Sequence, residues 1–177
     1  ATAKRHCRVD HDEDDALLLA LIATARATVE AETGSALIEQ TLEFRLDTWP
    51  MLLYLPRPPV RSILSVTAID QAGTPTVVSA GAYQLRTGLQ PGYILFEQSM
   101  LPTVTLATVA GVRVRYTAGY GTAADVPRPL LQVMLMLIGH WYAYREVVTP
   151  GNLSALPFSV DRLLAPYRVY WYGDWEQ

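Results

Sequence analysis

The sequence has little that could support cross-linking, catalysis or strong attraction to nucleic acid. Cys7 is the single cysteine among 177 residues, which excludes an internal disulfide. Only 18% of the residues are charged, whereas about 25% is usual in soluble domains. The formal net charge is −3, so the chain has no overall basic excess for groove binding to DNA. Such sparse charge suggests that part of the surface does not face water.

Long hydrophobic runs are also missing. The most apolar stretch, residues 130–144, would reach only about 22 Å as a helix, which is shorter than a bilayer core. Gln132 and His140 interrupt it. We therefore expect no membrane span, and no signal or transit peptide is recognisable.

Catalytic motifs are absent as well. The sequence contains no G-x-S-x-G, no phosphate-binding loop, no H-E-x-x-H and no Cys-x-x-Cys. His6, His11 and His140 each lack a companion that would make a catalytic pair. A glycine turn at residues 119–121 precedes a helix and could bind phosphate, but so short a turn is weak evidence. We expect no enzymatic activity, no metal and no cofactor.

The densest charge is the acidic run at residues 10–15. Its carboxylates and His11 could hold a metal ion, which would suit a metal-dependent enzyme. Alternatively, Asp12 caps a helix and the next three acidic residues fill its first turn, where the helix dipole favours negative charge. The second interpretation is favoured, because a helix follows and the spacing of a calcium-binding loop is missing.

The sequence predicts three helical segments. Residues 1–9 form a short helical piece, and a second helix runs to about Thr33, with Leu18, Ile22, Ala25 and Val29 on one stripe. Gly34 would end it. A central helix at residues 130–144 follows a proline-marked start and is apolar on several sides.

Between these helices, alternating patterns predict short strands. They lie at residues 41–46, 62–69, 76–78, 83–86, 93–96 and 112–116. The segment at residues 53–60 must lie at a sheet edge or leave the sheet, because its three prolines cannot donate hydrogen bonds to a neighbouring strand. The predicted class is α+β: long N-terminal and central helices packed together, with an inserted small antiparallel β region and an extended C-terminal tail. We expect one domain over residues 1–166, with a β-rich insertion at about 36–118, and a tail at 167–177.

The C-terminal tail is unusually aromatic, because five of its first nine residues are Tyr or Trp. Such side chains concentrate at interfaces, since they offer a large apolar area with a polar tip. The tail could fold back on its own chain or dock on another subunit or partner.

Several motifs together resemble the head-tail connector, or adaptor, proteins of tailed phages, prophages and gene transfer agents. The motifs include R-V-D-H-D-x-x-D-A-L, L-P-R-P-P-V-x-S-I, V-R-V-R-Y-x-A-G-Y-G and H-W-Y-x-x-R-E. With three further pieces they lie at residues 8–17, 30–41, 55–63, 112–121, 126–130, 140–146 and 163–169. The resemblance extends over nearly the whole chain.

This resemblance implies a structural protein of a virion or phage-like particle, located at the head-tail interface and made in the bacterial cytoplasm. It implies a homo-oligomeric ring of about twelve copies between the portal protein and the tail stopper. Double-stranded DNA would pass through the ring without sequence-specific binding. Family adaptors reach the portal with their C-terminal segment, so the candidate portal contacts are Tyr167, Arg168, Tyr170, Trp171, Tyr172 and Trp175. The sequence beyond Val169 departs from the family pattern, which leaves its docking partner open.

Two arginines on one strand face have three possible roles. Arg113 and Arg115 could line the bore, pair with carboxylates between subunits, or face solvent. The other candidate subunit contacts are Trp141, Tyr144 and Arg145. Because clustered cations would hold DNA phosphates, we expect a neutral or acidic bore. The alternative function is a nucleic-acid-binding DNA-packaging accessory protein, whose binding would weaken steeply with salt.

Overall fold

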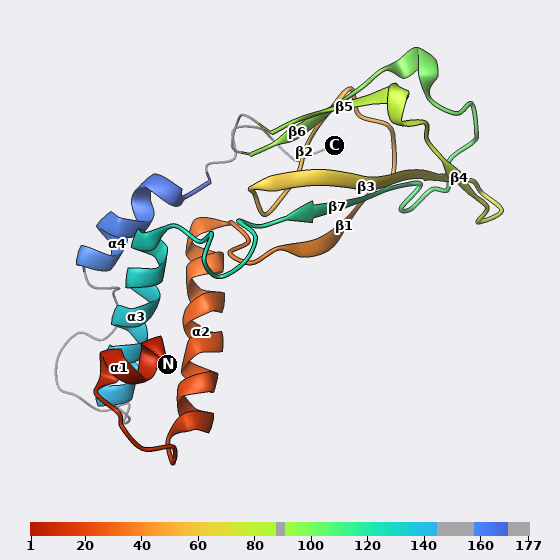
Figure 1. Cartoon of the computed structure of the whole chain (residues 1–177). Coiled ribbons are helices and arrows are strands. Elements are labelled where there is room, and N and C mark those ends of the chain that lie inside the picture. Colours follow the sequence, from red (N-terminus) through yellow and green to blue (C-terminus); the bar gives the residue numbers. More distant parts are fainter. Residues whose placement is uncertain (88–90, 145–157, 170–177) are drawn as a thin grey trace. The chain divides into compact units, whose positions relative to one another are not determined.

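The computed structural model describes residues 1–87, 91–144 and 158–169, which form two compact units (Figure 1). The helical unit contains residues 1–34 and 124–168. The β unit contains residues 35–123 together with Val169. The single domain expected over residues 1–166 stays a prediction, because compactness alone does not say whether either unit folds independently.

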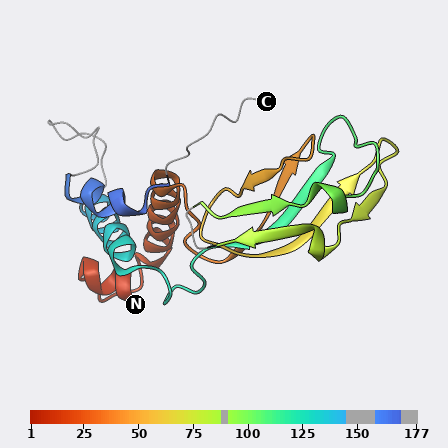
Figure 2. The ribbon, with the colours of Figure 1, turned by 90° about the horizontal axis from the view of Figure 1, so that it is seen from above.

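The helical unit is built around α3 (Arg128–Ala143). This helix contacts α1 (Thr2–Cys7), α2 (Asp15–Thr33) and α4 (Phe158–Leu164), and Figure 2 shows it between α1 and α4. A 3-10 turn, η3 (Ala165–Tyr167), follows α4. No helix in residues 1–87, 91–144 and 158–169 is long and apolar enough to cross a membrane.

The predicted stripe of α2 is largely confirmed. Leu18, Ala25 and Val29 are buried, and Ile22 is half-buried. Gly34 ends the helix with φ 69°, a left-handed conformation that costs glycine little. On α3 the buried residues Leu130, Val133, Leu137 and Ile138 follow helical spacing.

Two antiparallel sheets make up the β unit and appear as two layers in Figure 1. The four-stranded sheet has the order β1 (Gln40–Leu46), β7 (Val112–Ala118), β3 (Val60–Ile69), β4 (Pro75–Val77). The three-stranded sheet has the order β2 (Leu52–Tyr54), β6 (Tyr93–Phe96), β5 (Tyr83–Arg86). The connections include the 3-10 turns η1 (Ala80–Ala82) and η2 (Gln98–Met100). The predicted strands are thus found, and β2, which ends before the prolines at positions 56, 58 and 59, is an edge strand of its sheet.

One hydrophobic core joins the inner faces of both sheets. It takes Val114 and Tyr116 from β7, and Leu53 and Ile94 from the three-stranded sheet. Alternate residues of β7 point into this core, and the arginines between them point away. The Tyr116 hydroxyl donates a hydrogen bond to the Pro56 carbonyl oxygen at 2.8 Å, and burial raises the pKa of Tyr116.

The predicted fold class is wrong. The chain is a mixed fold with a short set of helices and two antiparallel sheets, not long N-terminal and central helices carrying a small β region. The N-terminal part is divided between α1 and α2, and the β segments enclose a core of their own. The strands are short and lie far apart in the sequence, so local patterns do not show that together they form two sheets with a core of their own. The extended tail beyond residue 169 lies outside the described residues.

Candidate interaction surfaces

The acidic run is held by Lys4 of α1. Its Nζ lies 2.6 Å from Asp12 Oδ1 and 2.6 Å from Asp15 Oδ1. The hydrogen bond to Asp12 raises the pKa of Lys4, and the same bond lowers the pKa of Asp12. Asp14 accepts a hydrogen bond from the Tyr142 hydroxyl of α3. Within the described residues, no group of three or more His, Cys, Asp or Glu side chains is placed to hold a metal ion.

The predicted capping role of Asp12 is wrong. The N-cap of α2 is Asp14, and its side chain makes no capping hydrogen bond. Asp12 is instead an ion-pair partner of Lys4, which a reading of local sequence alone could not reveal. Asp15 does lie in the first turn, where negative charge is favourable.

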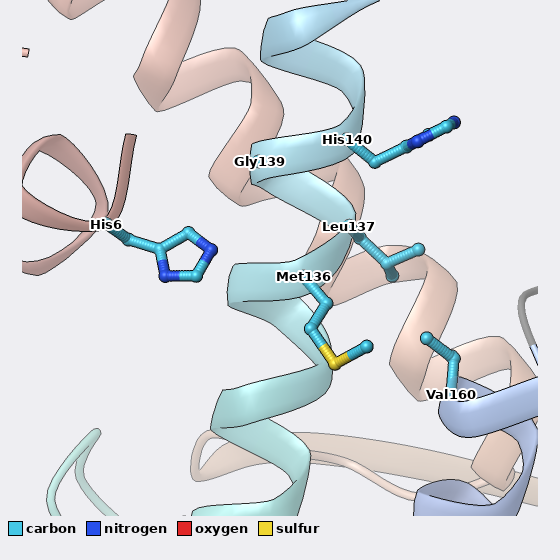
Figure 3. A pocket seen from close by; sticks show the side chains of 6 residues that line it. All are labelled: His6, Met136, Leu137, Gly139, His140 and Val160. Carbon is cyan, nitrogen blue, oxygen red and sulfur yellow. The ribbon is translucent and has the colours of Figure 1, made fainter. Parts of the chain in front are cut away.

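An apolar groove in the helical unit carries two of the three histidines (Figure 3). It is lined by His6, Met136, Leu137, Gly139, His140 and Val160. The His6 side chain points toward α3, whereas His140 points away from it (Figure 3). A Cβ on Gly139 would lie 3.1 Å from His6 Nε2, so a larger residue at this position would crowd the His6 ring. The two histidines do not converge on one reactive point.

The glycine turn after β7 serves backbone packing rather than phosphate. A Cβ on Gly119 would lie 2.4 Å from the Ile38 carbonyl oxygen, and Gly119 has φ 118°. Its N–H donates to the Pro59 carbonyl oxygen at 2.8 Å, and the Tyr120 N–H donates to the Leu37 carbonyl oxygen at 3.3 Å. The amides of Gly119 and Tyr120 are therefore not free to bind an anion.

The two arginines of β7 lie on the outer face of the four-stranded sheet. Arg115 is exposed and Arg113 is half-buried. In the β1–β7 register Arg113 lies opposite Arg45, and Arg115 lies opposite Glu43. The sequence predicted the shared face but not this neighbouring arginine on β1, because strand pairing is not visible in local patterns.

The other candidate subunit contacts lie near the end of α3. Tyr144 is 58% exposed, and its ring centroid lies 5.1 Å from that of His140. Trp141 is half-buried. Arg145 lies outside the described residues. Tyr144 and His140 therefore offer an accessible aromatic surface.

Arg168, at the start of the C-terminal segment, forms ion pairs with two residues of the helical unit. Arg168 Nη2 lies 2.9 Å from Glu32 Oε2 and 2.8 Å from Asp161 Oδ1. The hydrogen bond to Glu32, and then that to Asp161, raises the pKa of Arg168. Tyr167 is half-buried in η3. The remaining candidate portal contacts lie outside the described residues: Tyr170, Trp171, Tyr172 and Trp175.

Comparison with known proteins agrees with the motifs. Residues 1–73 match the family model for phage gp6-like head-tail connector proteins. The resemblance to head-tail connectors is confirmed. No curated protein sequence matches this chain.

Three solved particle structures contain similar chains, each 27% identical to this one. The neck of an empty gene transfer agent particle, with C6 symmetry, gives a TM-score of 0.80 and covers 97% of this chain and 89% of that chain. The neck of the native particle, with C12 symmetry, gives a TM-score of 0.76, and the match covers 96% of this chain and 89% of that chain. The virion of the native particle gives a TM-score of 0.81, and the match covers 97% of this chain and 89% of that chain. Both units of this connector-like chain are therefore included in the similarity.

Proposed function

We propose that this chain is a structural adaptor at the head-tail interface of a phage-like particle such as a gene transfer agent. In this role it forms a ring between the portal and the tail stopper and continues the DNA channel. The observation that carries the proposal is the similarity to a neck protein over 97% of this chain, with a TM-score of 0.80.

The ring is supported by the symmetry of the similar necks, C6 in one case and C12 in another. An apolar composition with few charges also suits permanent interfaces, which are more hydrophobic than transient ones. We propose Arg113, Arg115, Trp141, Tyr144 and Arg145 as contacts between subunits. We propose Tyr167, Arg168, Tyr170, Trp171, Tyr172 and Trp175 as contacts to the portal.

Deleting residues 168–177 tests the portal contact. The described core contacts lie upstream of this segment, so the shortened chain should fold and show a circular dichroism spectrum close to that of the full chain. It should fail to bind portal-containing heads in a sedimentation assay, because the aromatic contacts are lost.

The deletion also removes the ion pairs of Arg168 with Glu32 and Asp161, so Arg168→Gln measures how much of the loss comes from the arginine alone. If the aromatic residues carry most of the contact, this variant should lose much less binding to heads than the shortened chain does. Undiminished binding of the shortened chain would contradict the tail assignment.

A further inference from the structure

An unbalanced group of arginines lies on the outer face of the four-stranded sheet. We name Arg45, Arg113 and Arg115 the arginine cluster. In the register of β1 with β7, Arg45 faces Arg113 and Glu43 faces Arg115. On the β3 side, the opposing residues are Thr67 and Ser65, which carry no charge. These strand positions therefore bring together three guanidinium groups and one carboxylate, and that carboxylate is paired with Arg45, whose Nε lies 2.7 Å from Glu43 Oε1.

This arrangement carries a cost within a single chain. Like charges placed directly opposite each other on neighbouring strands are destabilising. Arg113 Nε is buried and has no hydrogen-bond partner among the described residues. A protein with net charge −3 thus keeps a locally positive, incompletely paired surface. An anionic partner would offset the repulsion between the arginines, since a guanidinium binds carboxylates through paired, charge-assisted hydrogen bonds.

The acidic run at residues 10–15 also contains carboxylates that are not paired with Lys4. Asp12 and Asp15 are bound to Lys4, and Asp14 to Tyr142. Asp10 and Glu13 are exposed, and within the described residues neither has an ion pair. A ring of more than two identical subunits needs two different surfaces per subunit, one for each neighbour. A positive surface and a negative one on the same chain meet that requirement.

We infer that the arginine cluster of one subunit docks on Asp10 and Glu13 of the next copy of this chain. This inference rests on the proposed ring. A second copy fits better than DNA, because clustered arginines facing the bore would hold phosphates that must slide past. The net negative charge of the chain also favours carboxylates as the partner.

Engineered disulfides test the contact in assembled particles. On a Cys7→Ser background, the pair Glu13→Cys and Arg115→Cys should give a ladder of covalent multimers after mild oxidation. The control pair Glu13→Cys and Arg86→Cys moves the second thiol to β5 of the other sheet and should stay monomeric. Monomers from both pairs, in particles that contain the protein, would overturn the inference.

Charge reversal gives a second, independent measurement. Arg113→Glu with Arg115→Glu should reduce the fraction of tailed particles about tenfold or more, because docking surfaces of like charge repel. Adding Asp10→Arg and Glu13→Arg should restore it. Arg86→Glu places one charge reversal on the other sheet as a control for position, and thermal unfolding of each purified variant separates misfolding from failed docking.

The remaining outcomes are distinct. Normal tails on Arg113→Glu, Arg115→Glu particles would overturn the inference while leaving the adaptor role intact. Normal tails with impaired DNA delivery would also overturn it, in favour of a DNA-facing cluster. Failure of the wild-type gene itself to restore tails in a strain lacking it would count against the proposed function.

Discussion

At the scale of single residues, burial decides which polar groups stabilise the fold. The Tyr116 side chain is 1% exposed, and its hydroxyl is satisfied by the Pro56 carbonyl. Tyr116→Phe should lower the free energy of unfolding by about 1 kcal/mol in urea denaturation, since it leaves that carbonyl without its donor. Tyr144→Phe, on an exposed ring, should change it by less than about 0.5 kcal/mol. Equal effects of the two changes would contradict this account.

The same residue predicts a response to alkaline pH. Burial raises the pKa of Tyr116 above its ordinary value of 10.0, so the folded state favours the neutral phenol. The stability that follows is fully present below about pH 10 and is lost as the pH rises toward the native-state pKa. Between about pH 9 and 11, unfolding free energy should therefore fall less steeply in Tyr116→Phe than in the wild type.

Sequence reasoning at this scale found the residues but not their partners. The alternation of β7 placed Arg113 and Arg115 on one face, because a strand has a fixed period of two. Arg168 and Glu32 are 136 residues apart, and no local spacing links them. The prediction that Arg168 contacts the portal therefore takes no account of its two intrachain carboxylates, Glu32 and Asp161.

At the scale of elements, the turn after β7 depends on glycine. Gly119→Ala would place a Cβ 2.4 Å from the Ile38 carbonyl oxygen at φ 118°. We expect a loss of about 2 kcal/mol or more in thermal unfolding, because both the clash and the backbone conformation are unfavourable. Gly73→Ala is the control: it also has positive φ, 83°, but no atom within 4 Å, so only the conformational cost of about 1 kcal/mol should appear. A smaller loss at Gly119 than at Gly73 would show that the turn relaxes.

The link between α1 and α2 gives a second prediction at this scale. Since Lys4 already neutralises Asp12 and Asp15, calorimetric titration with Mg²⁺ or Ca²⁺ should show no saturable binding. Asp12→Asn with Asp15→Asn should leave that result unchanged. Tight binding that the double variant abolishes would restore the metal-dependent alternative.

The elements themselves were more predictable than their assembly. Periodicity and proline positions located α2, α3 and most strands, because these signals are local. The partition into two sheets was not predicted, since pairs such as β1 with β7 join segments far apart in sequence. The predicted β region is too small for the same reason, because the residues of its core come from short segments that are far apart in sequence.

At the scale of the whole molecule, similarity over both units says more than any single motif. A family match over residues 1–73 and a TM-score of 0.80 over 97% of the chain point to the same class of neck protein. The contacts that we propose with partners are the arginine cluster, the exposed Tyr144 and the base of the aromatic segment.

Electron microscopy of particles from a strain lacking this protein, beside the complemented strain, tests the adaptor role most directly. The account predicts DNA-filled heads without tails in the deletion strain, and tailed particles once the gene is restored. Normally tailed particles in the deletion strain would contradict it.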